Sequence, residues 1–292
     1  MATIHPNPDF DPEAASNRFK ESMRGLGTDE EQIIQLLVDH SNDQRQEIKT
    51  QFATMFGQDM EQELKSELGG DFEEAVVALI TPPRVYDAKQ LKEAVKGAGT
   101  NEDTLIEILI TRSNDEIEEI KAIYKEEFDS ELLDDVQSDT SGYIKRLLFS
   151  QCNASRNEDS EGVDDGLAGE EAQEIYDAGE GQCGTDEAAI SRVFCLRSWS
   201  QLRATFDAYA AIADKDIRDV VKSETSGSLK DAYLAIGRSL KKIGHFLHNF
   251  RIDLEDVKTA FEAEYEQSLA DFVESDCGGD YKRLLLSIIN HE

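Results

Sequence analysis

Apolar residues recur along this chain at the three- and four-residue spacing that marks one face of a helix. One such set is "IIQLLV" (Ile33–Val38), and a matching set, "LIEILI" (Leu105–Ile110), follows later. Aromatic residues within patterns of this kind are assigned to the core: Phe52, Tyr124, Tyr209 and Phe261. No segment alternates between apolar and polar residues in the way that strands require. The pattern predicts an all-α protein of short helices.

A glycine-containing loop comes before each of these apolar sets. It reads "MRGLGTDEEQI" (Met23–Ile33), returns 72 residues later as "VKGAGTNEDTLIEIL" (Val95–Leu109), and after another 85 residues as "GEGQCGTDEAAISRVF" (Gly179–Phe194). Thr28 and Glu31 have the spacing of a capping box, which predicts that a helix begins at Thr28. Further capping-box spacings follow the three loops: Ser41 with Gln44, Ser113 with Glu116, and Ser198 with Gln201. A single glycine pair is typical of a corner between helices, whereas repeated copies indicate an internal repeat of about 70 residues.

Each loop has a carboxylate forty residues beyond its last glycine. The pairs are Gly27 with Glu67, Gly99 with Asp139, and Gly184 with Glu224. Each carboxylate follows a serine and precedes a turn that ends in glycine. Ca²⁺ takes six to eight oxygen ligands and accepts backbone carbonyls together with carboxylates. The pattern favours Ca²⁺ sites with one acidic side chain each, which we expect to bind weakly unless lipid phosphate oxygens complete them.

The charge of the chain restricts its partners. Lys+Arg 30 against Asp+Glu 62 gives a net charge of −32, which repels nucleic acid and acidic membranes unless a polyvalent cation mediates. The opening "MATIHPNPDF" has no basic and apolar segments of a signal peptide, and no apolar run reaches a membrane-spanning length. We therefore expect a cytoplasmic protein, no nucleic-acid partner, and four reduced cysteines without metal-site spacing.

These loops and acidic turns resemble those of the annexin family from about residue 14 to the C-terminus. The motifs stand as "MRGLGTDE", "VKGAGTNE" and "AGEGQCGTDE", with the turns "SEL" and "DTSG". The resemblance implies an all-α, annexin-like array of five-helix repeats that forms a curved disc. It also implies Ca²⁺ as cofactor and reversible, peripheral binding to acidic phospholipid membranes through the convex face. We expect no catalytic residues. The protein partners are unknown.

The resemblance assigns Ca²⁺ ligands residue by residue. The first site comprises Met23, Gly25, Gly27 and Glu67. The second site comprises Val95, Gly97, Gly99 and Asp139, and the third comprises Gly179, Gln182, Gly184 and Glu224. The carboxylates would bind through their side chains and the other residues through backbone carbonyls. Arg24 and Lys96 would contact lipid phosphate, although a basic residue in an exposed turn is more often simply solvated.

The fourth repeat departs from the family pattern. The segment Arg251–Ile288 resembles the second half of a repeat and carries Asp276 where the site carboxylate belongs, but no GxGT loop precedes it. We expect the first two helices of this repeat to be missing and Asp276 to bind no Ca²⁺. The missing helices should leave apolar positions more exposed than their counterparts in repeats 1 and 2: Leu254, Val257, Phe261 and Leu284.

The predicted organisation has three complete repeats and a truncated fourth. The bounds are a tail over 1–13, repeats over 14–82 and 83–152, an acidic linker over 153–166, a third repeat over 167–244 and a truncated repeat over 245–292. Three functions fit the chain: a Ca²⁺-dependent phospholipid-binding protein, an acidic helical scaffold that binds proteins without a lipid role, or a metal-assisted hydrolase. No Ser/His/Asp or Cys/His set stands out, which argues against the hydrolase.

Overall fold

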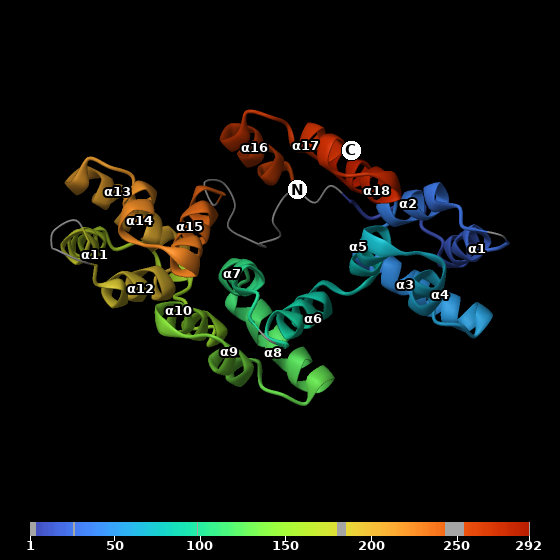
Figure 1. Ribbon diagram of the computed structural model, residues 1–292, viewed down its shortest axis with the longest axis horizontal. Coiled ribbons are helices and arrows are strands. Elements are labelled where there is room, and N and C mark those ends of the chain that lie inside the picture. Colours follow the sequence, from blue (N-terminus) through green and yellow to red (C-terminus); the bar gives the residue numbers. More distant parts are fainter. Residues whose placement is uncertain (1–3, 26, 98, 180–184, 243–253, 292) are drawn as a thin grey trace. The chain divides into compact units, whose positions relative to one another are not determined.

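The structure, a computed structural model, describes residues 4–25, 27–97, 99–179, 185–242 and 254–291. Every regular element within these ranges is helical, as the apolar spacing predicts (Figure 1). None of the helices in the described part is long and apolar enough to cross a membrane.

A set of five helices occurs three times along the chain. The first set is α1 (Pro12–Ser22), α2 (Glu30–Val38), α3 (Asn42–Phe56), α4 (Met60–Glu67) and α5 (Gly70–Ile80). The second is α6 (Pro83–Ala94), α7 (Glu102–Thr111), α8 (Asn114–Phe128), α9 (Leu132–Asp139) and α10 (Gly142–Cys152). The third is α11 (Asp165–Ala178), α12 (Glu187–Leu196), α13 (Trp199–Ala213), α14 (Ile217–Glu224) and α15 (Gly227–Lys242), and the short 3₁₀ helix η1 (Asp159–Glu161) precedes it.

The described part ends with three helices that correspond to the third, fourth and fifth of a set. They are α16 (Leu254–Tyr265), α17 (Leu269–Asp276) and α18 (Gly279–Ile289). The segment "HFLHNF", where the first half of this repeat was expected, lies outside the described residues. Within the described residues the last repeat thus has three helices where each of the others has five, in keeping with the predicted truncation.

Polar side chains fix where the helices begin. The predicted capping box at Thr28 is wrong: α2 begins at Glu30, and Asp29 is its N-cap and accepts a bond from the backbone N–H of Gln32 at 3.0 Å. An aspartate side chain satisfies this N–H as well as a threonine does, so the helix starts one residue later and Thr28 stays in the loop. The predicted capping boxes that open α3 and α8 are both present.

The third expected capping box is only half formed. Ser198 caps α13, but the side chain of Gln201 instead bonds both backbone groups of Asp164, at 2.8 and 2.9 Å. Gln44 holds both backbone groups of Asn7 in the same way, each at 2.8 Å. These two glutamines thus fasten the chain that leads into α11 and α1.

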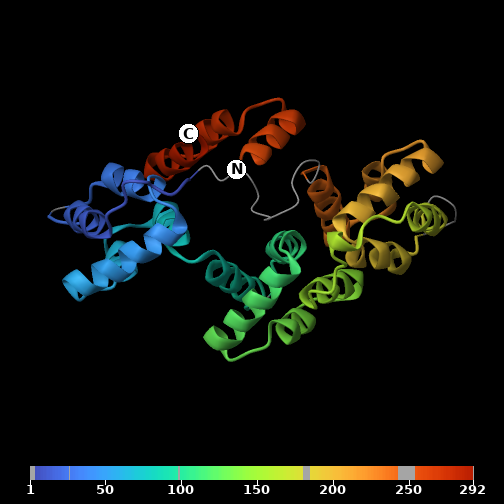
Figure 2. The same ribbon diagram turned by 180° about the vertical axis from the view of Figure 1, so that it is seen from behind.

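The chain forms two compact units, each with its own apolar core. One unit holds Met1–Tyr86 together with Arg251–Glu292, and the other holds Asp87–Phe250. The first core centres on α1 to α5, and Figures 1 and 2 both show α18 beside α2 and α5 of that unit. The second core joins repeats 2 and 3, where α7 packs against α15 and α10 against α12.

The segment between repeats 2 and 3 is fastened to α13. The guanidinium of Arg156 lies 4.2 Å from the ring centre of Trp199 and donates to the carbonyl of Arg197 at 2.7 Å. Burial lowers the pKa of Arg156 to about 10. Asp159 accepts from the backbone N–H of Ser200 at 2.8 Å. Arg156 and Asp159 of the acidic linker therefore bind groups of the protein itself.

In repeat 1 a lysine of the first helix covers an aromatic pair at the end of the third. The ammonium of Lys20 lies 5.7 Å from the ring centre of Phe52 and 5.9 Å from that of Phe56. Glu63 of α4 holds the same ammonium at 3.0 Å. The lysine therefore joins three helices, with a cation–π attraction of about 0.5–1 kcal/mol at such partly exposed sites.

Repeat 2 repeats this arrangement with different residues. Lys92 of α6 lies 5.4 Å from the ring centre of Tyr124 and 5.8 Å from that of Phe128. Asp135 of α9 accepts from Lys92 at 2.8 Å and from the Tyr124 hydroxyl at 2.6 Å. Burial raises the pKa of Asp135, but these hydrogen bonds outweigh it and hold the pKa below its usual value.

Repeat 4 carries the aromatic pair without such a lysine among its described residues. Phe261 and Tyr265 occupy the pair's positions, with ring centres 4.6 Å apart, and Phe272 stands where Glu63 stands in repeat 1. Tyr265 is 61% exposed and Phe272 is 41% exposed. Phe261 is half-buried whereas Phe52 is fully buried, and Leu254 and Val257 are also half-buried, as expected for the truncated repeat.

The expectation for Leu284 is wrong. Its side chain is fully buried in the core of repeat 1, with Tyr281 and Ile288 of the same helix packed against that core. The support comes from a complete repeat, because α18 lies against α2 and α5.

We predict that α16 and α17 exchange amide hydrogens before α3 and α4, and that α18 exchanges later than both α16 and α17. An uncovered aromatic ring loses part of the roughly 1.5–3 kcal/mol that full burial supplies, so these two helices open at lower cost. Hydrogen exchange followed by mass spectrometry of peptides measures this order. Equal protection of α16 and α3 would contradict it.

Candidate metal centre

Each candidate loop joins the first and second helices of a repeat and is closed at its base by one backbone hydrogen bond. The N–H of Asp29 donates to the carbonyl of Ser22 at 2.8 Å, closing residues 23–28. Asn101 donates to Ala94 at 2.9 Å, and Asp186 donates to Ala178 at 2.7 Å. The third loop, 179–185, is one residue longer than the loop at 95–100 but closes in the same way.

The glycines of the first two loops adopt backbone angles that other residues resist. The φ angles are 118° at Gly25, 91° at Gly27, 96° at Gly97 and 107° at Gly99. A side-chain Cβ built at any of these positions would meet nothing within 4 Å. Glycine is therefore required by the backbone conformation rather than by crowding, and this conformation lets a short loop reverse its peptide groups.

The predicted carboxylates occupy one equivalent position in each repeat. Glu67 is the last residue of α4, Asp139 of α9 and Glu224 of α14. Glu67 and Asp139 are exposed and Glu224 is half-buried. In the described part of the chain no lysine or arginine forms an ion pair with any of the three, so a cation could bind each of them without breaking a salt bridge. Asp276 has the same place at the end of α17.

A threonine hydroxyl ties the loop to the acidic turn in repeats 2 and 3. Thr100 donates to the backbone carbonyl of Asp139 at 2.7 Å. Thr185 lies 3.2 Å from the backbone carbonyl of Glu224 and 3.4 Å from its carboxylate. In these two repeats the loop therefore lies next to the carboxylate that is forty residues away in sequence. The forty-residue spacing alone does not predict this contact, although the threonine that recurs at the same place in all three loops is a signal for it.

In repeat 1 the threonine of the loop bonds the start of α2, and the carboxylate lies in a cavity shared with that helix start. Thr28 donates to the carboxylate of Glu30 at 2.5 Å. Glu30 and Glu67 line a common cavity of about 340 Å³, together with Asp71 and with Asp280 of α18. Glu67 therefore lies on the side of the loop from which α2 starts.

The remaining predicted residues lie at the edges of the loops. Met23 is the C-cap of α1, Gly179 that of α11, and Val95 follows α6 directly. Gln182 and Gly184 lie outside the described residues. Arg24 is exposed, whereas the ammonium of Lys96 pairs with Glu93 at 2.9 Å. This ion pair is exposed, and such pairs contribute about 0–1 kcal/mol, so a lipid phosphate could replace it.

The fold defines an all-α protein of related repeats, and comparisons identify its family. The annexin family model matches residues 13–79, 86–150, 170–236 and 247–288. Annexin A13 of Homo sapiens is 40% identical over 304 residues, which cover 96% of each protein. Annexin A3 of Homo sapiens is 40% identical over 309 residues, which cover 98% of this chain and 95% of the relative.

Solved structures agree with this assignment. The structure of annexin III matches with a TM-score of 0.90 at 38% identity and covers 99% of this chain and 97% of its own. Calcium-bound annexin (Sm)1 matches with a TM-score of 0.83 at 29% identity, with 99% and 93% covered. The chain therefore belongs to the annexin family. Membership implies Ca²⁺-dependent binding to phospholipid, and the family is generally non-enzymatic.

We predict that the double variant Thr100→Val/Thr185→Val needs more Ca²⁺ to bind acidic vesicles. Each valine removes the hydroxyl that holds a loop to its acidic turn, and a net hydrogen bond of about 1 kcal/mol corresponds to roughly fivefold in an equilibrium constant. The half-point of a Ca²⁺ series in vesicle co-sedimentation measures the change. Thr28→Val is the control, because among the described residues the hydroxyl of Thr28 bonds Glu30 of α2 and not the acidic turn. The idea fails if the double variant and Thr28→Val shift the half-point equally.

Proposed function

We propose that this annexin docks on acidic phospholipid through Ca²⁺ ions held between its loops and the carboxylates forty residues further on. The observation that carries the proposal is the contact of Thr100 with Asp139 and of Thr185 with Glu224. These contacts bring two segments that are far apart in sequence to one place on the surface.

The available donor atoms fit a hard cation. The loops offer backbone carbonyl oxygens and each acidic turn offers a carboxylate, so the set consists of oxygen alone, which suits Ca²⁺. In this proposal the carbonyls of Met23, Gly25 and Gly27 act with Glu67, and those of Val95, Gly97 and Gly99 act with Asp139. Gly179, Gln182 and Gly184 act with Glu224. The calcium-bound state of the relative annexin (Sm)1 supports the choice of ion.

The charge of the chain supports a bridging role for the ion. With a net charge of −32, the protein and an acidic membrane repel each other until bound cations reverse the local sign. A site with one carboxylate leaves part of the Ca²⁺ charge uncompensated and some ligand positions open, and lipid phosphate oxygens can fill those positions. Arg24 and Lys96 stand within the first two loops and would add contacts to phosphate. The protein would then move reversibly between cytoplasm and membrane surface.

The fourth repeat should take no part in this binding. Asp276 has the position of a site carboxylate, but no loop with the GxGT pattern precedes it in the sequence. A lone exposed carboxylate binds Ca²⁺ so weakly that it stays empty at Ca²⁺ concentrations that fill the complete sites. This difference supplies a control within the same molecule.

We predict that the triple variant Glu67→Gln/Asp139→Asn/Glu224→Gln requires far more Ca²⁺ to sediment with acidic vesicles than the native protein does. Each amide removes the one charged ligand of a proposed site while keeping its size. Since two of the side chains are exposed and one is half-buried at helix ends, we expect the helical circular dichroism signal to be unchanged.

Asp276→Asn is the matched control, and it should bind vesicles at the native Ca²⁺ concentration. A chelator should release the native protein from the vesicles. Binding that persists in chelator, or a triple variant with the native Ca²⁺ dependence, would refute the proposed sites. In that case the alternative of an acidic scaffold without a lipid role would be favoured.

A further inference from the structure

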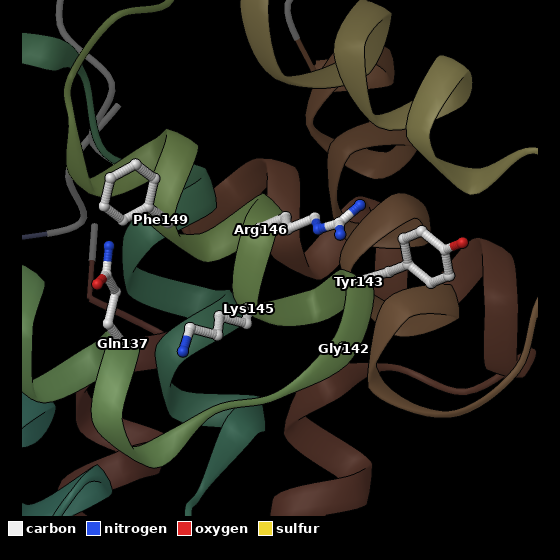
Figure 3. A pocket seen from close by; sticks show the side chains of 6 residues that line it. All are labelled: Gln137, Gly142, Tyr143, Lys145, Arg146 and Phe149. Atoms are coloured by element: carbon white, nitrogen blue, oxygen red, sulfur yellow. The ribbon is translucent and has the colours of Figure 1, made fainter.

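A groove on α10 is lined by cationic side chains that take no part in the proposed calcium sites. Its volume is about 550 Å³, and it is lined by Gln137 of α9 and by residues of α10: Gly142, Tyr143, Lys145, Arg146 and Phe149. Figure 3 shows Arg146 directed toward Tyr143, and Lys145 directed toward the side where Gln137 lies. The groove thus presents cationic groups toward both of its ends.

No carboxylate lines this groove, which is unusual in a chain with Asp+Glu 62 against Lys+Arg 30. Within the described residues neither Lys145 nor Arg146 forms an ion pair. The guanidinium of Arg146 instead lies 5.5 Å from the ring centre of Tyr143, which is itself 42% exposed. Both cations are therefore available to a negatively charged ligand.

The equivalent positions in the other repeats show that this composition is specific to repeat 2. Each repeat has a glycine of left-handed conformation at the start of its last helix, with φ of 60° at Gly70, 63° at Gly142, 60° at Gly227 and 59° at Gly279. Counting from that glycine, the positions of Gln137, Tyr143, Lys145 and Arg146 contain at least one carboxylate in every other repeat. They are Lys65, Asp71, Glu73 and Glu74 in repeat 1; Lys222, Ser228, Lys230 and Asp231 in repeat 3; and Glu274, Asp280, Lys282 and Arg283 in repeat 4.

Repeat 4 also has an arginine at the position of Arg146, and that arginine is paired with carboxylates. Arg283 pairs with Asp280 of its own helix and with Glu31 of α2, the latter at 3.2 Å. In repeat 2 the first partner is replaced by Tyr143. The second corresponds to Ala188 of α12, because the N-cap residues Asp29 and Asp186 set the register of the two helices. Arg146 has therefore lost both carboxylates that hold its counterpart.

We propose that this groove binds a small ligand with more than one phosphate group, of the inositol phosphate class. Arginine offers a planar fork that matches phosphate oxygens, lysine adds a point charge, and the Tyr143 hydroxyl and the Gln137 amide are further donors. The two cationic heads point to different sides of the groove, which favours a ligand with separated phosphates. The net charge of −32 repels a long polyanion, so the ligand is small or is a lipid headgroup.

The groove lies close to a proposed calcium site, because Gly142 is three residues beyond Asp139. An inositol phosphate headgroup bound here would add to docking through the second loop, whereas a soluble inositol phosphate would bind without a membrane. Neither case depends on Ca²⁺ being held by the groove itself.

The soluble case is tested on the full-length chain in chelator with inositol 1,4-bisphosphate as the probe. We expect amide chemical shifts in ¹H–¹⁵N spectra to change at Gln137 and over 142–149, and the affinity to fall at least about tenfold in Lys145→Gln/Arg146→Gln, since two charge-assisted contacts are lost. The matched control is Lys222→Gln/Lys230→Gln, which removes the same charge from repeat 3, where Asp231 stands at the position of Arg146. Equal loss in both double variants, or shifts spread over basic residues elsewhere, would overturn the proposal.

The membrane case is tested in Ca²⁺ with vesicles of phosphatidylcholine containing either phosphatidylinositol 4-phosphate or phosphatidylserine at equal surface charge. If the lipid headgroup is the ligand, Lys145→Gln/Arg146→Gln raises the Ca²⁺ needed for the phosphoinositide vesicles and leaves the phosphatidylserine vesicles unaffected. An unaffected phosphoinositide response together with a positive soluble test assigns the groove to a soluble ligand. Absence of a response in both tests overturns the inference. Native binding to phosphatidylserine vesicles reports on the calcium sites separately.

Discussion

The helices of this protein depend on each other because they are short. The complete repeats consist of helices of 8 to 16 residues, and isolated helices of this length are marginal in water even with favourable sequences. Their stability comes from one apolar face that each helix buries against others of its unit. A loop between two such helices is then held at both ends by packed elements. This is how a six-residue turn such as 23–28 can keep glycines at φ angles near 90–120°.

The excess of carboxylates is the second general feature, and the structure shows which cations pair with them. Lys20 and Lys92 each bind a carboxylate and cover two rings, so these two cations contribute to packing between helices. The proposed site carboxylates have no such partner among the described cations, and the groove on α10 has cations without carboxylates. Among the described residues, unpaired carboxylates thus stand where a cation is proposed to bind, and unpaired cations stand in the groove where an anion is proposed to bind. Elsewhere they are paired or solvated.

Much of the fold followed from the sequence because it rests on local patterns. The apolar spacing predicted helices throughout, and the repeated loop and carboxylate predicted three equivalent pairs of segments, two of which are joined by threonine hydroxyls. The errors concern contacts that local patterns do not specify. Asp29 instead of Thr28 caps α2, because either side chain can accept a hydrogen bond from a backbone N–H in the first turn. The burial of Leu284 depends on α2 and α5, more than 200 residues away in sequence, which no periodicity within α18 reveals.

The packing of α18 into the first unit has a consequence for synthesis of the chain. Repeats 2 and 3 form a continuous segment, Asp87–Phe250, and can complete their core as soon as that segment has left the ribosome. Repeat 1 precedes repeats 2 and 3 in the chain, yet its core includes Leu284 and is complete only when α18 has emerged. Bringing the two parts of this unit together closes a loop that contains the whole of Asp87–Phe250, and the entropy lost in closing it opposes these long-range contacts. Repeat 1 is thus synthesised before repeats 2 and 3 but its unit is completed after theirs, so that during translation its apolar surface is left for chaperones to protect.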